Sequence, residues 1–284
     1  MKATSSFKGQ TAGLYIVPTP IGNLEDMTYR AVRILQESDL VAAEDTRQTM
    51  KLFNHFEIET KLVSYHEHNK QVSGARLLAD LQDGKQVALV SDAGMPGISD
   101  PGSDLIRSAI DADVPVIVLP GANAALTALV ASGLATERFL YYGFLPRKKK
   151  ERREALETVR YESGTLIFYE APHRLKEMLG ALRDVLGDRQ LTLARELTKR
   201  YEEYIRGSVT EALEWAGEDV RGEFVVIVEG TTEERPTEIA QEADPLQQIE
   251  RYIEQGEKPN AALKRVAKER GLDRQELYLR YHES

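Results

Sequence analysis

The sequence predicts an α/β protein with two α/β domains and a small helical appendage at the C-terminus. From residue 13 onward strand signals alternate with helix signals, and such alternation is typical of mainly parallel sheets joined by right-handed crossovers. After Gly133 there are fewer helices per strand, which indicates a second sheet of mixed strand direction. After residue 230 the chain becomes acidic and polar before a last pair of short helices, which predicts a linker and an appendage.

The first predicted domain spans residues 13–133. Short runs rich in β-branched and aromatic residues, bounded by turn residues, predict its strands, and these are 13–18, 39–43, 62–65, 86–90 and 114–119. Apolar residues that recur every three to four positions predict its helices, and these are 26–38, 47–56, 72–82, 103–111 and 122–132. The last helix is rich in Ala and Leu, which indicates burial between other elements, and Gly133 ends it.

The second predicted domain spans residues 134–230, with strands expected at 139–145, 165–169, 191–197, 201–206 and 224–228. Its helices are expected at 149–161, 174–186 and 209–216. Residues 231–284 are expected to form a linker with one helix and then helices at 261–269 and 273–282, the second capped by Asp273. These last two helices resemble a helix-turn-helix that binds nucleic acid, and a simple helical hairpin is an equal alternative. Residues 1–12 are expected to be a flexible lead-in.

The composition excludes several kinds of chemistry. The chain has no cysteine, which excludes disulfides, cysteine-ligated zinc, iron–sulfur clusters and a thiol nucleophile, and fits a reducing compartment. Its longest apolar runs have the length of strands, far below the ~20 residues that a membrane-spanning helix needs. The first residues lack the apolar stretch of a secretory signal. We therefore expect a cytoplasmic protein without a membrane partner.

The net charge of −9 argues against a nucleic-acid partner, since phosphate contacts usually require a basic surface. The charge is nevertheless uneven along the chain. One basic cluster is interrupted only by Glu151 and consists of Arg147, Lys148, Lys149, Lys150, Arg152 and Arg153. Residues 258–284 carry seven Lys and Arg against four Asp and Glu. These segments are candidate RNA contacts, although a solvated helix face explains a single basic run equally well.

Turns that follow strands are the places to search for a site, because ligands of parallel α/β sheets bind beyond the carboxyl ends of the strands. The second such turn holds Glu44, Asp45 and Arg47, which either contact a substrate or cap the next helix. The third holds His66 and His68, and a metal site would need a third ligand that the sequence does not supply. No metal is therefore expected, and His66 is a candidate for substrate contact or proton transfer.

The first and fourth turns are rich in glycine and proline. Pro18 and Pro20 stiffen the first turn, in which Gly22 permits a close backbone approach. The fourth turn, SDAGMPGISDPG at residues 91–102, follows a buried strand and exposes backbone amides to a ligand. It matches neither the Walker A motif nor Gly-x-Gly-x-x-Gly, so kinase, ATPase and ordinary dinucleotide-binding functions lose support.

These turns and several later motifs resemble the class III, tetrapyrrole-methylase-like S-adenosylmethionine methyltransferases. The matching segments run in order from residue 17 to 230 and are VPTPIGNLEDMTYRA, AEDTR, SYHEHN, SDAGMPGISDPG, VLPGANAALTALVASG, GFLPRK, FYEAPHR, ARELTK and GEFVVIVEG. Four of them, AEDTR, SYHEHN, GFLPRK and YEAPHR, are similar to the branch that methylates the ribose 2′-hydroxyl of a cytidine in small-subunit ribosomal RNA. The resemblance implies a cleft between two domains that holds S-adenosyl-L-methionine, a homodimer, and small-subunit ribosomal RNA as partner in the assembled subunit.

The resemblance also implies site residues. Those near the cofactor are expected to be Pro18, Asp92, Ala93, Gly94, Ile98, Ser99, Gly121, Ala122, Phe144, Glu170, Ala171, Leu197 and Gly222. A ribose hydroxyl needs a base, or a cation that stabilises the alkoxide, and the candidates are Glu44, Asp45, His66, Glu170 and Lys199. Lys199 alternatively pairs with Glu202 or Glu203 on the surface. Candidate RNA contacts are Arg47, Arg147, Lys148, Lys149, Lys150 and Arg274.

Two other functions stay open at this point. A small-molecule tetrapyrrole methylase would share the fold and the cofactor but methylate carbon on an acidic macrocycle, which the basic cluster and the helical appendage disfavour. A non-enzymatic helix-turn-helix regulator that senses a metabolite would fit the negative net charge, but the crowded polar turns disfavour it.

Overall fold

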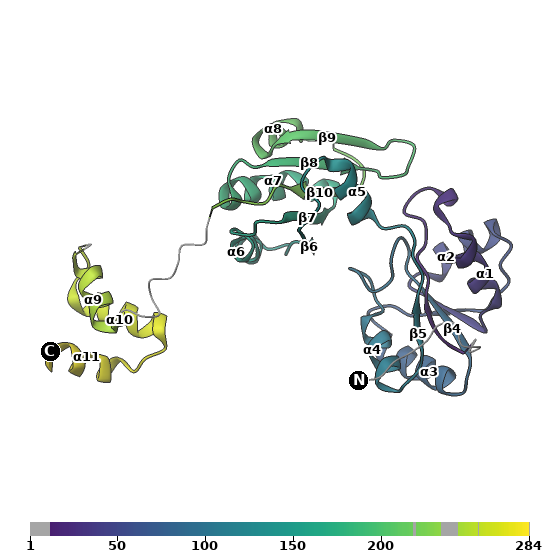
Figure 1. Ribbon diagram of the computed structural model, residues 1–284, viewed down its shortest axis with the longest axis horizontal. Helices are drawn as coiled ribbons and strands as arrows, with labels where there is room; N and C mark the ends of the chain where they lie inside the picture. Colours follow the sequence, from purple (N-terminus) through teal and green to yellow (C-terminus); the bar gives the residue numbers. More distant parts are fainter. Residues whose placement is uncertain (1–11, 218–219, 234–243, 255, 284) are drawn as a thin grey trace. The chain divides into compact units, whose positions relative to one another are not determined.

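Figure 1 shows the computed structural model of the chain, which describes residues 12–217, 220–233, 244–254 and 256–283. The chain divides into two compact units, Met1–Thr232 and Glu233–Ser284. The flexible lead-in expected at the N-terminus lies outside the described residues except for Ala12, and so does the part of the predicted linker at 234–243. Within the described residues, no helix has both the length and the apolar character needed to cross a bilayer.

The first unit begins with a five-stranded sheet in the order β3-β2-β4-β1-β5, in which all neighbouring strands are parallel. Its strands are β1 (Gly13–Ile16), β2 (Leu40–Ala43), β3 (Leu62–Ser64), β4 (Gln86–Val90) and β5 (Val116–Val118). The helices that connect them are α1 (Tyr29–Glu37), α2 (Thr46–His55), α3 (Lys70–Gln82) and α4 (Ser103–Asp111). The predicted alternation is therefore confirmed, and it brings the carboxyl ends of all these strands to one edge of the sheet.

Both faces of the first sheet are buried, because successive side chains of a strand point to opposite faces. On one face, Tyr15 of β1 shares a core cluster with Ile34 of α1 and Phe53 of α2. On the other face, Leu14 shares a second cluster with Leu105 of α4. Figure 1 shows α1 and α2 on one side of the strands and α3 and α4 on the other. Helices thus occupy both faces of the sheet, and the loops at the carboxyl ends of the strands are where a ligand is expected.

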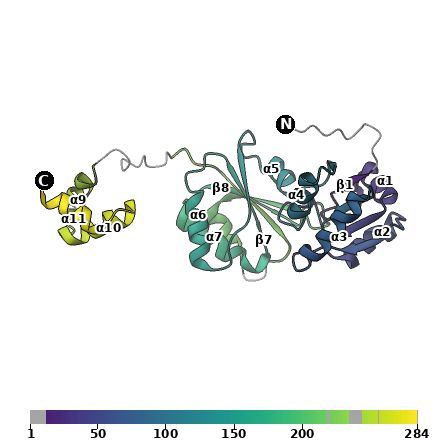
Figure 2. The same ribbon diagram turned by 90° about the horizontal axis from the view of Figure 1, so that it is seen from below.

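The second sheet has the mixed strand direction that the sequence predicts. Its order is β6-β7-β10-β8-β9, with β6 and β7 parallel and the other neighbours antiparallel. Its strands are β6 (Phe139–Phe144), β7 (Thr165–Glu170), β8 (Gln190–Arg195), β9 (Glu203–Ser208) and β10 (Phe224–Val228). The helices α6 (Lys149–Thr158), α7 (Pro172–Leu186) and α8 (Val209–Trp215) share the core of one face, and α6 and α7 are visible side by side in Figure 2.

Helix α5 (Ala124–Ser132) covers the opposite face of the second sheet. Ala125 and Leu129 pack there against Ile167 and Val225, and Gly133, with a φ of 80°, ends the helix as expected. The burial expected for this helix holds for one face only, since Val130 is 77% exposed. The first compact unit contains both sheets, so the domain boundary near residue 133 stays a prediction.

Most element bounds differ from the predicted ones by one to three residues, and at two segments the structure shows the reason. Strand β8 ends at Arg195 rather than at Leu197, because Glu196 and Thr198 adopt left-handed φ values of 50° and 63° and the ELTK segment forms a turn. The next strand, β9, therefore starts later than predicted. The helix predicted from residue 26 starts only at Tyr29, since the Thr28 hydroxyl caps it after a short 3-10 turn.

The second unit contains three helices among its described residues, α9 (Pro245–Glu254), α10 (Pro259–Arg270) and α11 (Arg274–Glu283). They share a small core that includes Ile249, Val266 and Leu277. Gly271 ends α10 with a φ of 64°, and the Asp273 carboxylate accepts hydrogen bonds from the first backbone amides of α11. The pair of helices around a glycine turn is thus present, and α9 packs against it as a third member.

Candidate active site

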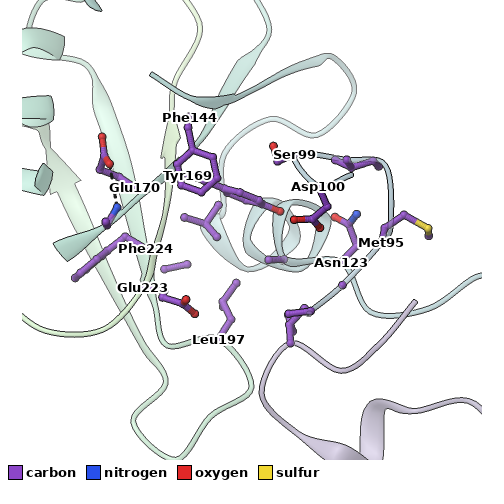
Figure 3. Close-up of a pocket in the computed structure, with 18 of the residues that line it drawn as sticks. Met95, Ser99, Asp100, Asn123, Phe144, Tyr169, Glu170, Leu197, Glu223 and Phe224 are labelled. Atoms are coloured by element: carbon purple, nitrogen blue, oxygen red, sulfur yellow. Dashed lines mark hydrogen bonds between the residues drawn. The ribbon is translucent and has the colours of Figure 1, made fainter. Parts of the chain in front are cut away.

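A cavity of about 380 Å³ lies between the two halves of the first unit (Figure 3). The loop after β4 and the first turn of α5 line one side of it. The ends of β6, β7 and β10 and the ELTK turn line the other. Its lining residues are Ile21, Ala93, Gly94, Met95, Ile98, Ser99, Asp100, Asn123, Ala124, Phe144, Tyr169, Glu170, Ala171, Ala194, Leu197, Lys199, Glu223, Phe224 and Val225.

The first and fourth turns of the sequence form one wall because they are hydrogen-bonded to each other. Thr19 and Gly94 exchange two backbone hydrogen bonds of 3.0 and 2.9 Å, and the buried Thr19 hydroxyl donates to the Ser91 carbonyl at 3.1 Å. Gly94 has a φ of 76°, a conformation that favours glycine. The hydrogen bonds that Thr19 makes with Gly94 and Ser91 thus hold the two loops together at the cavity.

Ser99 connects this wall to the second sheet. Its φ of 62° lies in the left-handed region, and its hydroxyl is 2.6 Å from the Tyr141 hydroxyl on β6. A Cβ atom on Gly143 would come within 3.0 Å of the Ser99 Oγ, so the close approach requires a glycine there. An unfavourable backbone conformation that is held by a specific contact is often found at a functional site.

The N-terminus of α5 and Tyr169 form the next part of the cavity. The Asn123 side chain caps α5 by accepting from the Leu126 amide at 3.0 Å, and the Tyr169 hydroxyl accepts from the Ala125 amide at 3.1 Å. The Tyr169 ring packs edge to face against Tyr141 and Phe144, with ring centroids 5.3 and 5.6 Å away. These contacts fix the ring at the centre of the wall.

The environment of the cavity strongly raises the pKa of Asp100. Burial raises its pKa to about 7, and the negative charges of Glu44 and Asp92 act in the same direction, while a hydrogen bond with Ser91 opposes them. In Figure 3 the Asp100 carboxyl and the Tyr169 hydroxyl point toward each other into the cavity. A carboxyl that titrates near neutral pH is a feature of catalytic sites.

Of the predicted bases and cations, Glu170 and Lys199 line the cavity. The Glu170 side chain is fully buried, accepts from the Ala171 amide at 2.9 Å and lies 3.3 Å from the Arg174 guanidinium. Lys199 lies 3.0 Å from Glu196 and 2.8 Å from Glu223, so the expected alternative partners, Glu202 and Glu203, are not the ones found. Burial alone lowers the pKa of Lys199, but its hydrogen bonds to the two carboxylates outweigh burial and raise it.

Glu44, Asp45 and His66 are not among the residues that line the cavity. The Asp45 carboxylate caps α2 and binds Arg47, whose hydrogen bonds lower the pKa of Asp45 to about 2. Burial, followed by the charge of Asp92, raises the pKa of Glu44. The helix-cap alternative therefore describes Asp45, whereas Glu44 lies close enough to Asp92 and Asp100 for its charge to act on them.

His66 follows β3 and lies close enough to Glu44 for its charge to act there. Its Nδ1 is buried and has no hydrogen-bond partner among the described residues. The His66 and His68 rings are 6.0 Å apart, and within the described residues no group of three or more His, Cys, Asp or Glu side chains is placed to hold a metal ion.

The residues expected near the cofactor divide into two groups. Those that line the cavity are Ala93, Gly94, Ile98, Ser99, Phe144, Glu170, Ala171 and Leu197, and those that do not are Pro18, Asp92, Gly121, Ala122 and Gly222. The second group supports the walls. A Cβ on Gly121 would lie 2.7 Å from Pro18, and Asp92 accepts a hydrogen bond from the Asp45 amide at 3.0 Å. A Cβ on Gly222 would lie 2.5 Å from Glu196.

Sequence reasoning missed four polar lining residues, Asp100, Asn123, Tyr169 and Glu223. Asp100 belongs to the fourth turn and Tyr169 to the YEAPHR segment, so both lie inside segments that were recognised. What distinguishes Asp100 and Tyr169 from their neighbours is burial by distant parts of the chain, and a sequence pattern does not show such burial.

The candidate RNA contacts are exposed. They are Arg47, Arg147, Lys148, Lys149, Lys150 and, in the second unit, Arg274. Several are ion-paired: Arg47 binds Asp45 at 2.7 Å, and Lys148 binds Glu151 at 2.8 Å. Arg152 is only 4% exposed and binds Glu177 at 3.1 Å. This member of the basic cluster therefore contributes to the packing of the second sheet's helices rather than to the exposed basic surface.

Two sheets with a cavity at their strand ends are the architecture that the motifs predicted for a methyltransferase, and the family comparison agrees. Residues 13–213 match the family described as Tetrapyrrole (Corrin/Porphyrin) Methylases. The chain belongs to this family, as its motifs predicted. It is 54% identical over 288 residues to the Ribosomal RNA small subunit methyltransferase I of Halalkalibacterium halodurans, with both chains covered completely. It is 51% identical over 288 residues to the protein of that name in Bacillus subtilis, with 99% of each chain covered.

Solved structures show the same fold at much lower identity. Diphthine synthase matches with a TM-score of 0.60 at 15% identity, over 78% of this chain and 91% of that chain. Uroporphyrin-III C-methyltransferase from Thermus thermophilus, complexed with S-adenyl homocysteine, matches with a TM-score of 0.54 at 20% identity, over 76% of this chain and 96% of that chain.

Proposed function

We propose that this protein transfers a methyl group from S-adenosyl-L-methionine to the ribose 2′-hydroxyl of a cytidine in small-subunit ribosomal RNA. The observation that carries the proposal is full-length identity of 54% and 51% to two proteins named as small-subunit ribosomal RNA methyltransferases. Both alignments extend through the second unit, which the family match at 13–213 does not cover. A ribosomal substrate also agrees with the cytoplasmic location expected from the composition.

The cavity fits the proposed donor in size and chemistry. Its volume of about 380 Å³ lies within the range of small-molecule sites. Ile98, Phe144 and Leu197 supply apolar surface for a nucleoside. When bound, the donor supplies an electrophilic methyl group on a sulfonium, and the residues of the chain have to position it and exclude water.

The RNA is expected at the mouth of the cavity beside β6. Phe144, the last residue of β6, lines the cavity and is 52% exposed, so one face is available to stack on a base. The exposed Arg147 and Lys148 lie in the turn that follows, and the exposed Lys149 and Lys150 begin α6. A stacking ring next to a run of cations is the arrangement that a single-stranded nucleotide requires.

A homodimer, implied by the family resemblance, is the expected assembly. Leu126 and Val130 lie one helical turn apart on α5 and are 48% and 77% exposed. Apolar side chains exposed in this way are suited to contact a second copy of the chain.

The alternative is methylation of a small tetrapyrrole, which the family description and the solved uroporphyrin-III methyltransferases favour. The two functions differ in their substrate, so one experiment separates them. Small ribosomal subunits from cells that lack this protein and, in a parallel reaction, uroporphyrinogen would be incubated with the protein and labelled S-adenosylmethionine. The ribosomal RNA nucleosides would be mapped by mass. We expect label in 2′-O-methylcytidine. Label in uroporphyrinogen and none in RNA would contradict the proposal.

A further inference from the structure

The candidate bases of the proposed reaction differ greatly in their ability to accept a proton. Asp45 is a weak base, because its hydrogen bonds to Arg47 hold its pKa at about 2. Lys199 is held as a cation by Glu196 and Glu223, which raise its pKa. The Glu170 carboxylate is fully buried against Ala171 and Arg174, and in Figure 3 it points away from the centre of the cavity. Asp45 and Lys199 are thus poor bases at neutral pH. Burial raises the pKa of Glu170, but its side chain is directed away from the centre of the cavity.

Asp100 has the position that these groups lack. It lines the cavity and points into it opposite the Tyr169 hydroxyl. The preceding residue, Ser99, is held in a left-handed conformation by a 2.6 Å hydrogen bond to Tyr141 across the cavity wall. Asp100 is therefore fixed by the second sheet although it belongs to a loop of the first. A base has to be positioned before its pKa matters.

From this geometry we infer that Asp100 is the catalytic residue that accepts the proton of the substrate hydroxyl. The inference deepens the proposed function and rests on it. The groups that act on Asp100 come from several elements. Glu44, which follows β2, and Ser91 and Asp92, which follow β4, act on Asp100. The charge of Asp100 in turn raises the pKa values of Tyr141 on β6 and Tyr169 on β7. His66, after β3, acts on Glu44.

The proton balance follows from the two protonation states of Asp100. In the ionised state one carboxylate oxygen takes the proton of the 2′-hydroxyl while the ribose oxygen forms its bond to the methyl carbon. The bond between that carbon and sulfur breaks, and its electron pair stays on the sulfur of the departing neutral thioether. Asp100 then releases the proton to water. With a pKa of about 7, the carboxyl is ionised often enough to act as base and returns its proton readily.

The test compares Asp100→Asn with Asp104→Asn. Asp104 lies on α4, is bound to Lys70 at 2.9 Å, and does not line the cavity. With small ribosomal subunits as substrate, Asp100→Asn should lower kcat roughly 100- to 10,000-fold. The donor Kd, measured by calorimetry, should change less than threefold. The Asp104→Asn variant should keep wild-type kcat. A kcat above one tenth of wild type in Asp100→Asn would overturn the inference, and so would an equal loss of donor affinity.

A second readout does not depend on activity. A side-chain carboxyl that titrates near pH 7 should appear in ¹³C spectra of the donor-free wild-type protein and be absent from Asp100→Asn. Glu44→Gln should move that titration to lower pH, because a neighbouring negative charge is removed. Titration of Asp100 below pH 5 would contradict the inference, and this result does not depend on any methylation assay. Failure of the proposed function would be recognised separately, because the wild-type protein would then transfer no label to ribosomal RNA.

Discussion

At the scale of the residue, the environment of Asp100 should reduce stability at high pH. Its folded-state pKa of about 7 lies above its ordinary value of 3.8, so folding favours the protonated form. The stability that protonated Asp100 contributes is fully present below about pH 4 and is lost as the pH rises through 7. The full shift would correspond to roughly 4 kcal/mol, and because Asp100 is partly exposed we expect ~1–2 kcal/mol.

The free energy of unfolding of Asp100→Asn minus that of wild type should therefore be about 1–2 kcal/mol larger at pH 8 than at pH 4. Urea denaturation of both proteins at the two pH values measures this change. The same change in Asp104→Asn should be near zero, since Asp104 is an exposed surface ion pair. A parallel pH dependence in Asp100→Asn and wild type would show that Asp100 is not perturbed.

The sequence identified the loop that carries Asp100 but not Asp100 itself. The SDAGMPGISDPG segment is recognisable by its glycines and prolines, and both Asp92 and Asp100 occur in it. Asp92 is exposed and bonded to the Asp45 amide, whereas Asp100 is partly buried by residues from other strands. Burial is the main cause of the raised pKa of Asp100, and that burial depends on segments distant in the sequence that only the folded chain brings together.

At the scale of the element, the contact between the loop after β4 and strand β6 depends on Gly143. Its φ is 80°, and an added Cβ would lie 3.0 Å from the Ser99 Oγ. Gly133 has the same φ of 80° but no atom within 4 Å of an added Cβ. Gly143→Ala and Gly133→Ala should each lose about 1 kcal/mol of stability through backbone strain.

Only Gly143→Ala should also weaken donor binding and turnover, because only there does the methyl group displace Ser99 next to Asp100. We expect a loss of at least tenfold in kcat/KM, against less than twofold for Gly133→Ala. Calorimetry with S-adenosylmethionine and methyl-transfer assays on small subunits measure the two effects. Equal effects of both substitutions would mean that the contact with Ser99 has no functional consequence.

Most strands and helices were predictable from the sequence, because the apolar period changes clearly between them. Strand β4 and helix α4 have the predicted bounds. The ELTK turn was not predictable, since Leu191–Leu197 is a continuous strand by composition. There the left-handed Glu196 is held by Lys199 and by the Glu223 amide, which are contacts with residues outside the run.

At the scale of the whole molecule, the exposed face of α5 gives a test of the expected homodimer. Val130→Asp places a charge where an apolar contact with a second copy is proposed, and it should convert the dimer to a monomer. Val72→Asp is the matched control, since Val72 on α3 is 81% exposed. Sedimentation velocity at a fixed concentration measures both. A dimer that survives Val130→Asp would place its interface elsewhere.

The two compact units make a further prediction possible, because each has its own core. The cavity is lined only by residues before Thr232, so a chain ending at Thr232 should unfold at the wild-type temperature and bind the donor with a Kd within twofold of wild type. The removed segment includes the seven Lys and Arg of 258–284.

If the helices of the second unit bind RNA, the shortened chain should bind small subunits at least tenfold more weakly. The plot of log Kobs against log salt concentration should also become less steep, since each lost phosphate contact removes about 0.9 from the slope on a duplex and about 0.7 on a single strand. Arg274→Glu in the full chain should reproduce part of the effect without removing the fold, because Arg274 is exposed. Unchanged affinity and an unchanged slope would favour the simple helical module, since only a segment that contacts phosphates changes the number of counterions released on binding.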